Sequence, residues 1–147
     1  MKILVDADGC PVVNITIALA ARQNLECVLL CDTSHMFERS GARTITVSKG
    51  ADSVDFALVG MASPGDIVVT QDYGLAAMCL ARGARPIRQD GLLYTDGNIG
   101  ALLHERHAAR EFRLSGGRQK GAAKRTEKEN ENFSLALEAL LSGRSLA

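Results

Sequence analysis

Tryptophan is absent from this 147-residue sequence, and aromatic residues make up only 4% of it. Proteins that hold single-stranded nucleic acid on a broad aromatic platform need several stacking side chains, so this composition argues against such a platform. No apolar run approaches the ~18 residues that a membrane-spanning helix requires. With 46% hydrophobic and 23% charged residues, the sequence is typical of one globular domain with its own core.

Paired cysteines are also missing. The four cysteines, Cys10, Cys27, Cys31 and Cys79, form no C-x-x-C motif. Residues 1–6 (MKILVD) have the pattern of a strand rather than of a signal peptide. We therefore expect a cytoplasmic protein with no disulfide bond and no membrane contact, whose cysteines belong to the core.

The formal net charge is zero, but the charges are unevenly distributed. Residues 1–105 carry a net charge of −4, residues 106–128 carry +6 and residues 129–147 carry −2. An acidic body with a basic arm can bind a metal ion in one part and the phosphates of a polyanion in the other.

Strand and helix patterns alternate along most of the chain. This alternation predicts an α/β fold of three layers (α/β/α) with a mostly parallel sheet. The predicted strands are residues 2–7, 26–31, 43–47, 66–70 and 84–87. The predicted helices are residues 12–23, 51–61, 73–81 and 96–113, followed by one that starts after residue 126.

The last third of the chain changes in character. We predict one α/β domain over residues 1–114, a basic flexible loop over 115–125 and a helix over 126–147 that docks on the same domain. Thr126 followed by Glu129 is a capping-box signature for the start of that helix. Its apolar positions are Phe133, Leu135, Leu137, Leu140 and Leu141.

Carboxylates gather where predicted strands end, which is where open α/β sheets bind ligands. Asp6 and Asp8 close the first strand, Asp72 follows the fourth, and Asp52 and Asp55 lie in the first turn of a helix. Carboxylates held this close repel one another unless a cation lies between them, and Mg²⁺ or Mn²⁺ prefers such oxygen ligands. The alternative for Asp8, Asp52 and Asp72 is a helix-capping role.

The segment Val5 to Gly9 (VDADG) resembles the aspartyl-nucleophile loop of haloacid-dehalogenase-type phosphatases. Those enzymes also carry a Gly-Asp pair after a later strand, whereas Gly65-Asp66 precedes the strand here. We expect Asp66 to belong to a turn. A small phosphohydrolase with Asp6 as nucleophile is therefore retained only as an alternative.

Five longer segments resemble the YaiI/YqxD family of uncharacterised bacterial proteins, which is similar in fold to PIN-like domains, many of them metal-dependent ribonucleases. The segments are DADGCPV (6–12), SKGADSVDFALV (48–59), PGDIVVTQDYGLAAMCLARGA (64–84), YTDGNIGALLHERH (94–107) and RTEKENENFSLALEALL (125–141).

The resemblance implies a role for each acidic position. Asp6, with Asp8, matches the first acidic residue of PIN domains, and Asp72 matches the later one. Asp52 or Asp55 stands in for the acidic residues between them. A glutamate that PIN nucleases commonly carry early in the chain has no clear counterpart.

These residues together predict a Mg²⁺- or Mn²⁺-dependent ribonuclease. Asp6, Asp8, Asp55 and Asp72 are the predicted catalytic residues and, with Asp52, the predicted metal ligands. Thr70 and Gln71 are expected to orient these ligands. RNA is the expected partner, bound through its phosphates by Lys49, Arg106, Arg110, Arg113, Arg118, Lys120, Lys124 and Arg125. The alternative is a non-catalytic module of the same fold that binds RNA or a protein through its basic region.

Overall fold

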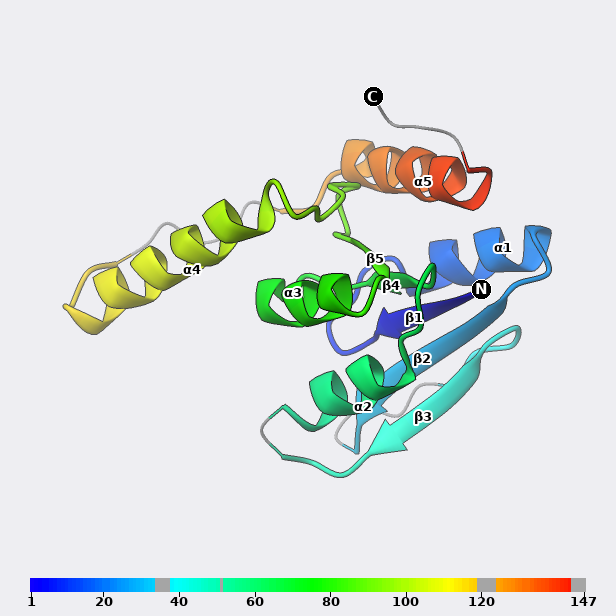
Figure 1. Ribbon diagram of the computed structural model, residues 1–147, viewed down its shortest axis with the longest axis horizontal. Helices are drawn as coiled ribbons and strands as arrows, with labels where there is room; N and C mark the ends of the chain where they lie inside the picture. The colour runs from blue at the N-terminus through cyan, green and yellow to red at the C-terminus, as the bar shows by residue number, and fades with distance from the viewer. Residues whose placement is uncertain (34–37, 51, 119–123, 144–147) are drawn as a thin grey trace.

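A five-stranded parallel sheet forms the centre of the molecule (Figure 1). The computed structural model describes residues 1–33, 38–50, 52–118 and 124–143. Neighbouring strands all pair in parallel, in the order β3-β2-β1-β4-β5. The strands are β1 (Lys2–Asp6), β2 (Glu26–Asp32), β3 (Arg43–Val47), β4 (Ile67–Val69) and β5 (Arg85–Ile87).

Helices cover both faces of the sheet, which confirms the predicted three-layer α/β/α fold (Figure 1). Helices α1 and α5 lie on one face and α2 and α3 on the other, while α4 contacts α3 and projects away from the sheet. The helices are α1 (Val13–Arg22), α2 (Ser53–Met61), α3 (Tyr73–Ala81), α4 (Ile99–Leu114) and α5 (Glu127–Leu141).

The alternation of side chains along the central strands determines which face of the sheet each residue lies on. Ile3 and Val5 of β1 are fully buried in the core that includes α1 and α5, and Leu4 is fully buried in the core on the α2 and α3 side. Since successive side chains of a strand point to opposite faces, Asp6 lies on the same side as Leu4. By the same alternation Thr70, two residues after Val68, lies on that side too.

The C-terminal helix α5 packs on α1. Its start is the predicted capping box, in which the Glu129 amide donates to the Thr126 hydroxyl and the Thr126 amide donates to the Glu129 carboxylate, both at 3.3 Å. Phe133 and Leu137 are fully buried. Leu135, another apolar position of this helix, is instead 64% exposed. Two positions along a helix correspond to about 200° of rotation, so Leu135 lies opposite Phe133.

The cysteines are all free thiols: Cys27, Cys31 and Cys79 are buried, and Cys10 is half-buried. Within the residues described, none of the helices combines the length and the apolar character needed to cross a membrane. Asp66 lies in a turn before β4, as expected, where its carboxylate accepts from the Lys2 ammonium at 2.6 Å and from the Ser63 amide at 2.9 Å.

The position of α5 depends on the absence of a side chain at Gly91. This glycine has a φ of +93°, and a Cβ there would lie 2.7 Å from the Asn132 carbonyl oxygen. Gly91→Ala should therefore lower the free energy of unfolding by at least about 1 kcal/mol in urea titrations.

Gly60→Ala is the matched control for that substitution. Gly60 lies within α2 with nothing inside 4 Å of its would-be Cβ, so alanine there should be neutral or stabilising by about 0.5–1 kcal/mol. Equal stability of the Gly91→Ala variant and the wild type would contradict this account of how α5 docks.

Candidate functional site

Thr70 connects the ends of β1 and β4 to the start of α3. Val5 pairs with Val69 in the ladder, so the following residues, Asp6 and Thr70, lie side by side. The Thr70 hydroxyl donates to the Asp6 carboxylate at 2.9 Å and accepts from the Asp72 amide at 3.0 Å. The Thr70 side chain, only 3% exposed, thus orients one carboxylate and the backbone of the next.

Asp72 combines the capping role with a charged contact. One of its carboxylate oxygens accepts from the Leu75 amide at 3.1 Å, which caps α3. The same oxygen lies 3.2 Å from the Arg106 guanidinium of α4 and accepts a hydrogen bond from it. Residues 34 positions apart therefore join the sheet edge to the projecting helix.

The acidic side chains raise one another's affinity for protons. Burial is the main cause that raises the pKa of Asp55 to about 6, and the charges of Asp72, Asp6 and Asp52 add to the effect. Arg106 acts in the opposite direction on Asp55. The pKa of Asp6 is also raised, first by burial and then by Asp72, despite the hydrogen bond from Thr70. These groups therefore share one electrostatic environment.

Asp8 lies toward the other neighbour of β1. Its carboxylate accepts from the backbone amide of Asp32 at 3.1 Å, at the end of β2. Asp52 is exposed and precedes α2 with a φ of +61° and no side-chain capping bond. Within the described part of the chain, no three His, Cys, Asp or Glu side chains converge closely enough to hold a metal ion. Of the predicted ligands, Asp6, Asp52, Asp55 and Asp72 adjoin Arg106, whereas Asp8 turns toward β2.

Two depressions meet at the ion pair between Asp72 and Arg106. The first, of about 440 Å³, is lined by Asp6, Gln71, Asp72, Tyr73 and Arg106. The second, of about 350 Å³, is lined by Asp52, Asp55, Phe56, Asp72, Gly74, Met78 and Arg106. A larger depression of about 590 Å³ lies beside Arg39 and Thr44, and no predicted site residue lines it.

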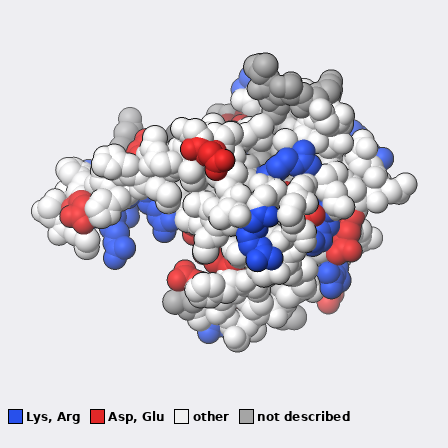
Figure 2. Space-filling model, viewed as in Figure 1, with Lys and Arg blue, Asp and Glu red and all other residues white. Residues whose placement is uncertain are grey.

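Helix α4 presents arginines to this acidic region. Arg106, Arg110 and Arg113 recur at spacings of four and three residues, so they share one face of the helix. Arg106 contacts Asp72, so this face turns toward the body of the protein. Figure 2 shows basic side chains along the side of α4 that faces α2 and α3, with acidic side chains on the body opposite.

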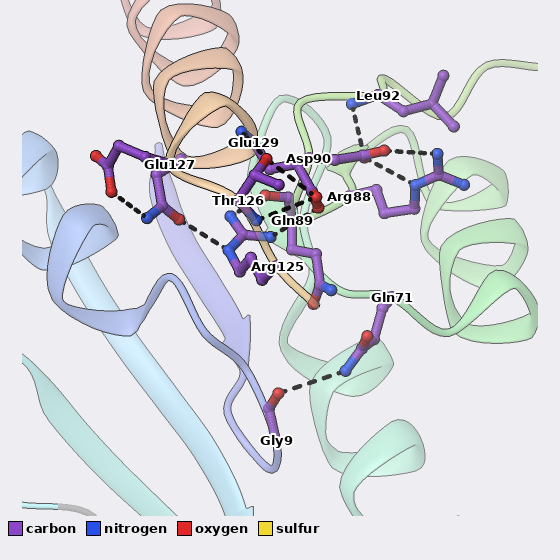
Figure 3. A network of polar contacts seen from close by, with 11 residues as sticks. Gly9, Gln71, Arg88, Gln89, Asp90, Leu92, Arg125, Thr126, Glu127 and Glu129 are labelled. Atoms are coloured by element: carbon purple, nitrogen blue, oxygen red, sulfur yellow. Dashed lines mark hydrogen bonds and ion pairs between the residues drawn. The ribbon is translucent and has the colours of Figure 1, made fainter. Parts of the chain in front are cut away.

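Arg125, another predicted phosphate-binding residue, makes its contacts within the protein. Arg125 is only 19% exposed in its side chain and donates to the Gln89 carbonyl at 2.7 Å and to the Asn130 side chain at 2.8 Å (Figure 3). These contacts join the start of α5 to the segment after β5. Lys49, Arg118 and Lys124 are exposed, and Lys120 lies outside the described residues.

Gln71 extends across the end of the sheet. Its side-chain amide donates to the Gly9 carbonyl at 3.5 Å, a long bond that spans from the segment after β4 to the loop after β1 (Figure 3). Gln71 is exposed, so this side chain lies at the surface of the first depression.

A second charged group near the site was not anticipated from the sequence. Arg88 donates to both oxygens of Asp90, at 2.8 and 2.7 Å, and to the Tyr73 hydroxyl at 2.9 Å. The Tyr94 hydroxyl donates to the Thr70 carbonyl at 3.0 Å. Tyr-Gly after Asp72 and Arg-Gln-Asp after β5 carry no recognisable motif, so no sequence signal indicated that these residues meet.

This chain is similar to known proteins over nearly its whole length. A family model described as "Uncharacterized BCR, YaiI/YqxD family" matches residues 4–143. The UPF0178 protein of Exiguobacterium sibiricum is 54% identical over 96% of this chain and 96% of its own. The UPF0178 protein of Ruminiclostridium cellulolyticum is 47% identical over 93% of this chain and 90% of its own length. No solved structure matches the chain.

Asp55 makes the electrostatics of the site measurable in the metal-free protein. Its folded-state pKa of about 6 exceeds the usual 3.8, so its ionised form destabilises the fold. The contribution of Asp55 to stability should therefore fall as the pH rises from about 4 to about 6. Asp55→Asn should therefore raise the free energy of unfolding at pH 7 by about 1–2 kcal/mol, after allowance for solvent screening, with no gain at pH 3.

Urea titrations in EDTA at both pH values would measure this effect. Glu105→Gln, at an exposed carboxylate of α4, is the control and should show no comparable gain. An Asp55→Asn variant no more stable than the wild type at pH 7 would contradict the repulsion described above.

Proposed function

We propose that this chain, which belongs to the YaiI/YqxD family of uncharacterised bacterial proteins, is a divalent-metal-dependent ribonuclease that hydrolyses phosphodiester bonds. The family match confirms the resemblance that was expected from the sequence, but the description of the family names no activity. One observation carries the proposal: the arginine face of α4 contacts the carboxylate cluster through Arg106 and Asp72. Cationic side chains suited to phosphates and carboxylates suited to a metal ion thus adjoin at one edge of the sheet.

The chemistry of the acidic side chains suits a hard cation. Asp6 and Asp55 have raised pKa values, first because of burial and then because neighbouring carboxylates repel their ionised forms. A Mg²⁺ or Mn²⁺ ion offsets that repulsion and prefers carboxylate oxygens. Asp6, Asp55 and Asp72 would hold it, with Asp8 and Asp52 at the margins. Since no group of three is assembled in the described residues, the side chains must draw together on binding.

The protein's own residues then have separable tasks. When bound, such an ion supplies an activated water and neutralises charge on the phosphate. Thr70 holds Asp6 in a fixed orientation through its hydroxyl. Arg106, Arg110 and Arg113 would bind the phosphates of the substrate. At 1.5 Å per residue, Arg113 lies about 10 Å along α4 from Arg106, so one strand can contact both.

A non-catalytic RNA-binding module is the second candidate. It is favoured by the lack of an assembled three-ligand group in the described part of the chain. The small phosphohydrolase has less support, because Asp66 pairs with Lys2 near the amino end of β1, whereas Asp6 ends that strand. We place the activity in the bacterial cytoplasm, which agrees with the four free thiols.

Metal binding and RNA cleavage should depend on the same carboxylates. The Asp6→Asn/Asp72→Asn double variant should lose at least about 100-fold in Mn²⁺ affinity, more than the loss of an outer partner of a ligand costs. It should also lose Mn²⁺-dependent cleavage of labelled single-stranded RNA. Calorimetric titration and gel analysis of the products measure these two effects.

Asp96→Asn is the control for the double variant, because Asp96 is exposed and lines neither depression at the site. The non-catalytic module would be favoured if the wild type does not cleave RNA and the double variant binds RNA as tightly as the wild type. Mn²⁺ binding of equal strength in the wild type and the double variant would refute the proposed site.

The arginine face of α4 should determine how RNA affinity depends on salt. Each phosphate contact contributes about 0.7 to the slope of log K against log salt for a single strand, so Arg110→Gln/Arg113→Gln should reduce that slope by about 1.4. Fluorescence anisotropy with a labelled oligonucleotide measures it. Arg39→Gln, an exposed position near the β3 edge, should leave the slope unchanged. An unaltered slope in the double variant would show that α4 does not contact the phosphates.

A further inference from the structure

Tyr73 occupies a position that the proposed chemistry does not use. It is the first residue of α3, immediately after Asp72, and it lines the depression of about 440 Å³ together with Asp6, Gln71 and Arg106. Its side chain is half-buried, whereas Tyr94 beside it is 3% exposed. Tyr94 therefore serves the packing of this region, and Tyr73 keeps part of its surface in the depression.

The ring of Tyr73 is held from two directions. The Arg88 guanidinium donates to its hydroxyl at 2.9 Å, and Asp90 fixes Arg88 through two further hydrogen bonds. Tyr94 meets the ring edge-to-face, with centroids 5.8 Å apart and planes at 65°. Such an arrangement lowers the entropy that the ring loses when a ligand binds it.

The other walls of the depression suit the remaining parts of a nucleotide. Gln71 carries both a donor and an acceptor, which can pair with the edge of a base. Arg106 supplies a cation for a phosphate. The volume of about 440 Å³ lies in the range of small-molecule sites and accommodates one nucleotide.

We propose that Tyr73 is the stacking surface for one unpaired nucleobase of single-stranded RNA, bound in the depression beside Asp6 and Asp72. The proposal rests on the proposed ribonuclease function for its substrate class and makes it more specific. A base within a duplex is already stacked on both faces, so the site selects unpaired nucleotides. A single stacking ring also agrees with a sequence in which aromatic residues make up only 4%.

The test is a binding experiment without turnover, on the full chain in EDTA. Adenosine 5′-monophosphate and ribose 5-phosphate are compared by calorimetry, since they differ only in the base. Stacking on an aromatic side chain contributes enough that Tyr73→Leu should weaken nucleotide binding about 5- to 150-fold. The affinity for ribose 5-phosphate should stay the same.

Tyr73→Phe is the matched variant, because it keeps the ring and loses the bond from Arg88. It should retain most of the nucleotide affinity. With no tryptophan in the chain, tyrosine fluorescence reports the contact: after correction for the light that adenine itself absorbs, the nucleotide should quench the wild type more than Tyr73→Phe. Circular dichroism verifies that each variant is folded.

The inference is overturned if millimolar nucleotide does not bind, if both ligands bind the wild type equally, or if Tyr73→Leu weakens both alike. It is also overturned if a single-stranded oligonucleotide and its duplex depend equally on Tyr73. Because no metal or cleavage is involved, Tyr73-dependent binding without ribonuclease activity would refute the proposed function alone. Cleavage without such binding would refute only the base site.

Discussion

The parallel ladder between β1 and β4 brings Asp6 beside Thr70, and the hydrogen bond between them links the carboxyl ends of both strands. The chain runs outward from β1 through β2 to β3, and then returns to add β4 and β5 on the opposite side of β1. The strand order therefore reverses between β1 and β4. Ligands of open α/β sheets bind at such reversals, and the candidate site lies there.

The acidic cluster at this edge of the sheet lowers the stability of the fold. Asp6 and Asp55 are both partly buried near other carboxylates, so their ionisation is disfavoured. Arg106 offsets part of that repulsion from α4, a helix with no buried residue that contacts the body mainly through α3. Under the proposed function, the same guanidinium would exchange its contact with Asp72 for one with a phosphate of the substrate.

The fold followed from the sequence because its signals are local. Short runs of apolar and β-branched residues marked the strands, and Thr126 with Glu129 marked the start of α5. The convergence of Asp6 and Asp72 followed from the rule that parallel strands end at one edge. The exposure of Leu135 did not follow from the sequence, because an apolar residue at an exposed helix position gives no sign of its exposure.

The side-chain contacts of the site did not follow from the sequence. The contact between Asp72 and Arg106 joins residues 34 positions apart and depends on the direction in which α4 leaves the body. The turn after β1 directs Asp8 to the Asp32 amide, which strand periodicity does not predict. Arg125, one of a run of basic residues, is largely buried among partners that only the packing of α5 brings to it.

The most direct test of the account is to locate a bound ion by nuclear magnetic resonance. Mn²⁺ broadens amide signals steeply with proximity, so substoichiometric Mn²⁺ maps its own position on a ¹H–¹⁵N spectrum. A metal site at this edge predicts selective broadening at Asp6, Asp55 and Asp72, with the amides of the C-terminal half of α5, near the amino ends of the strands, least affected. Broadening centred elsewhere, or none at millimolar Mn²⁺, would contradict a metal site at the carboxyl edge of the sheet.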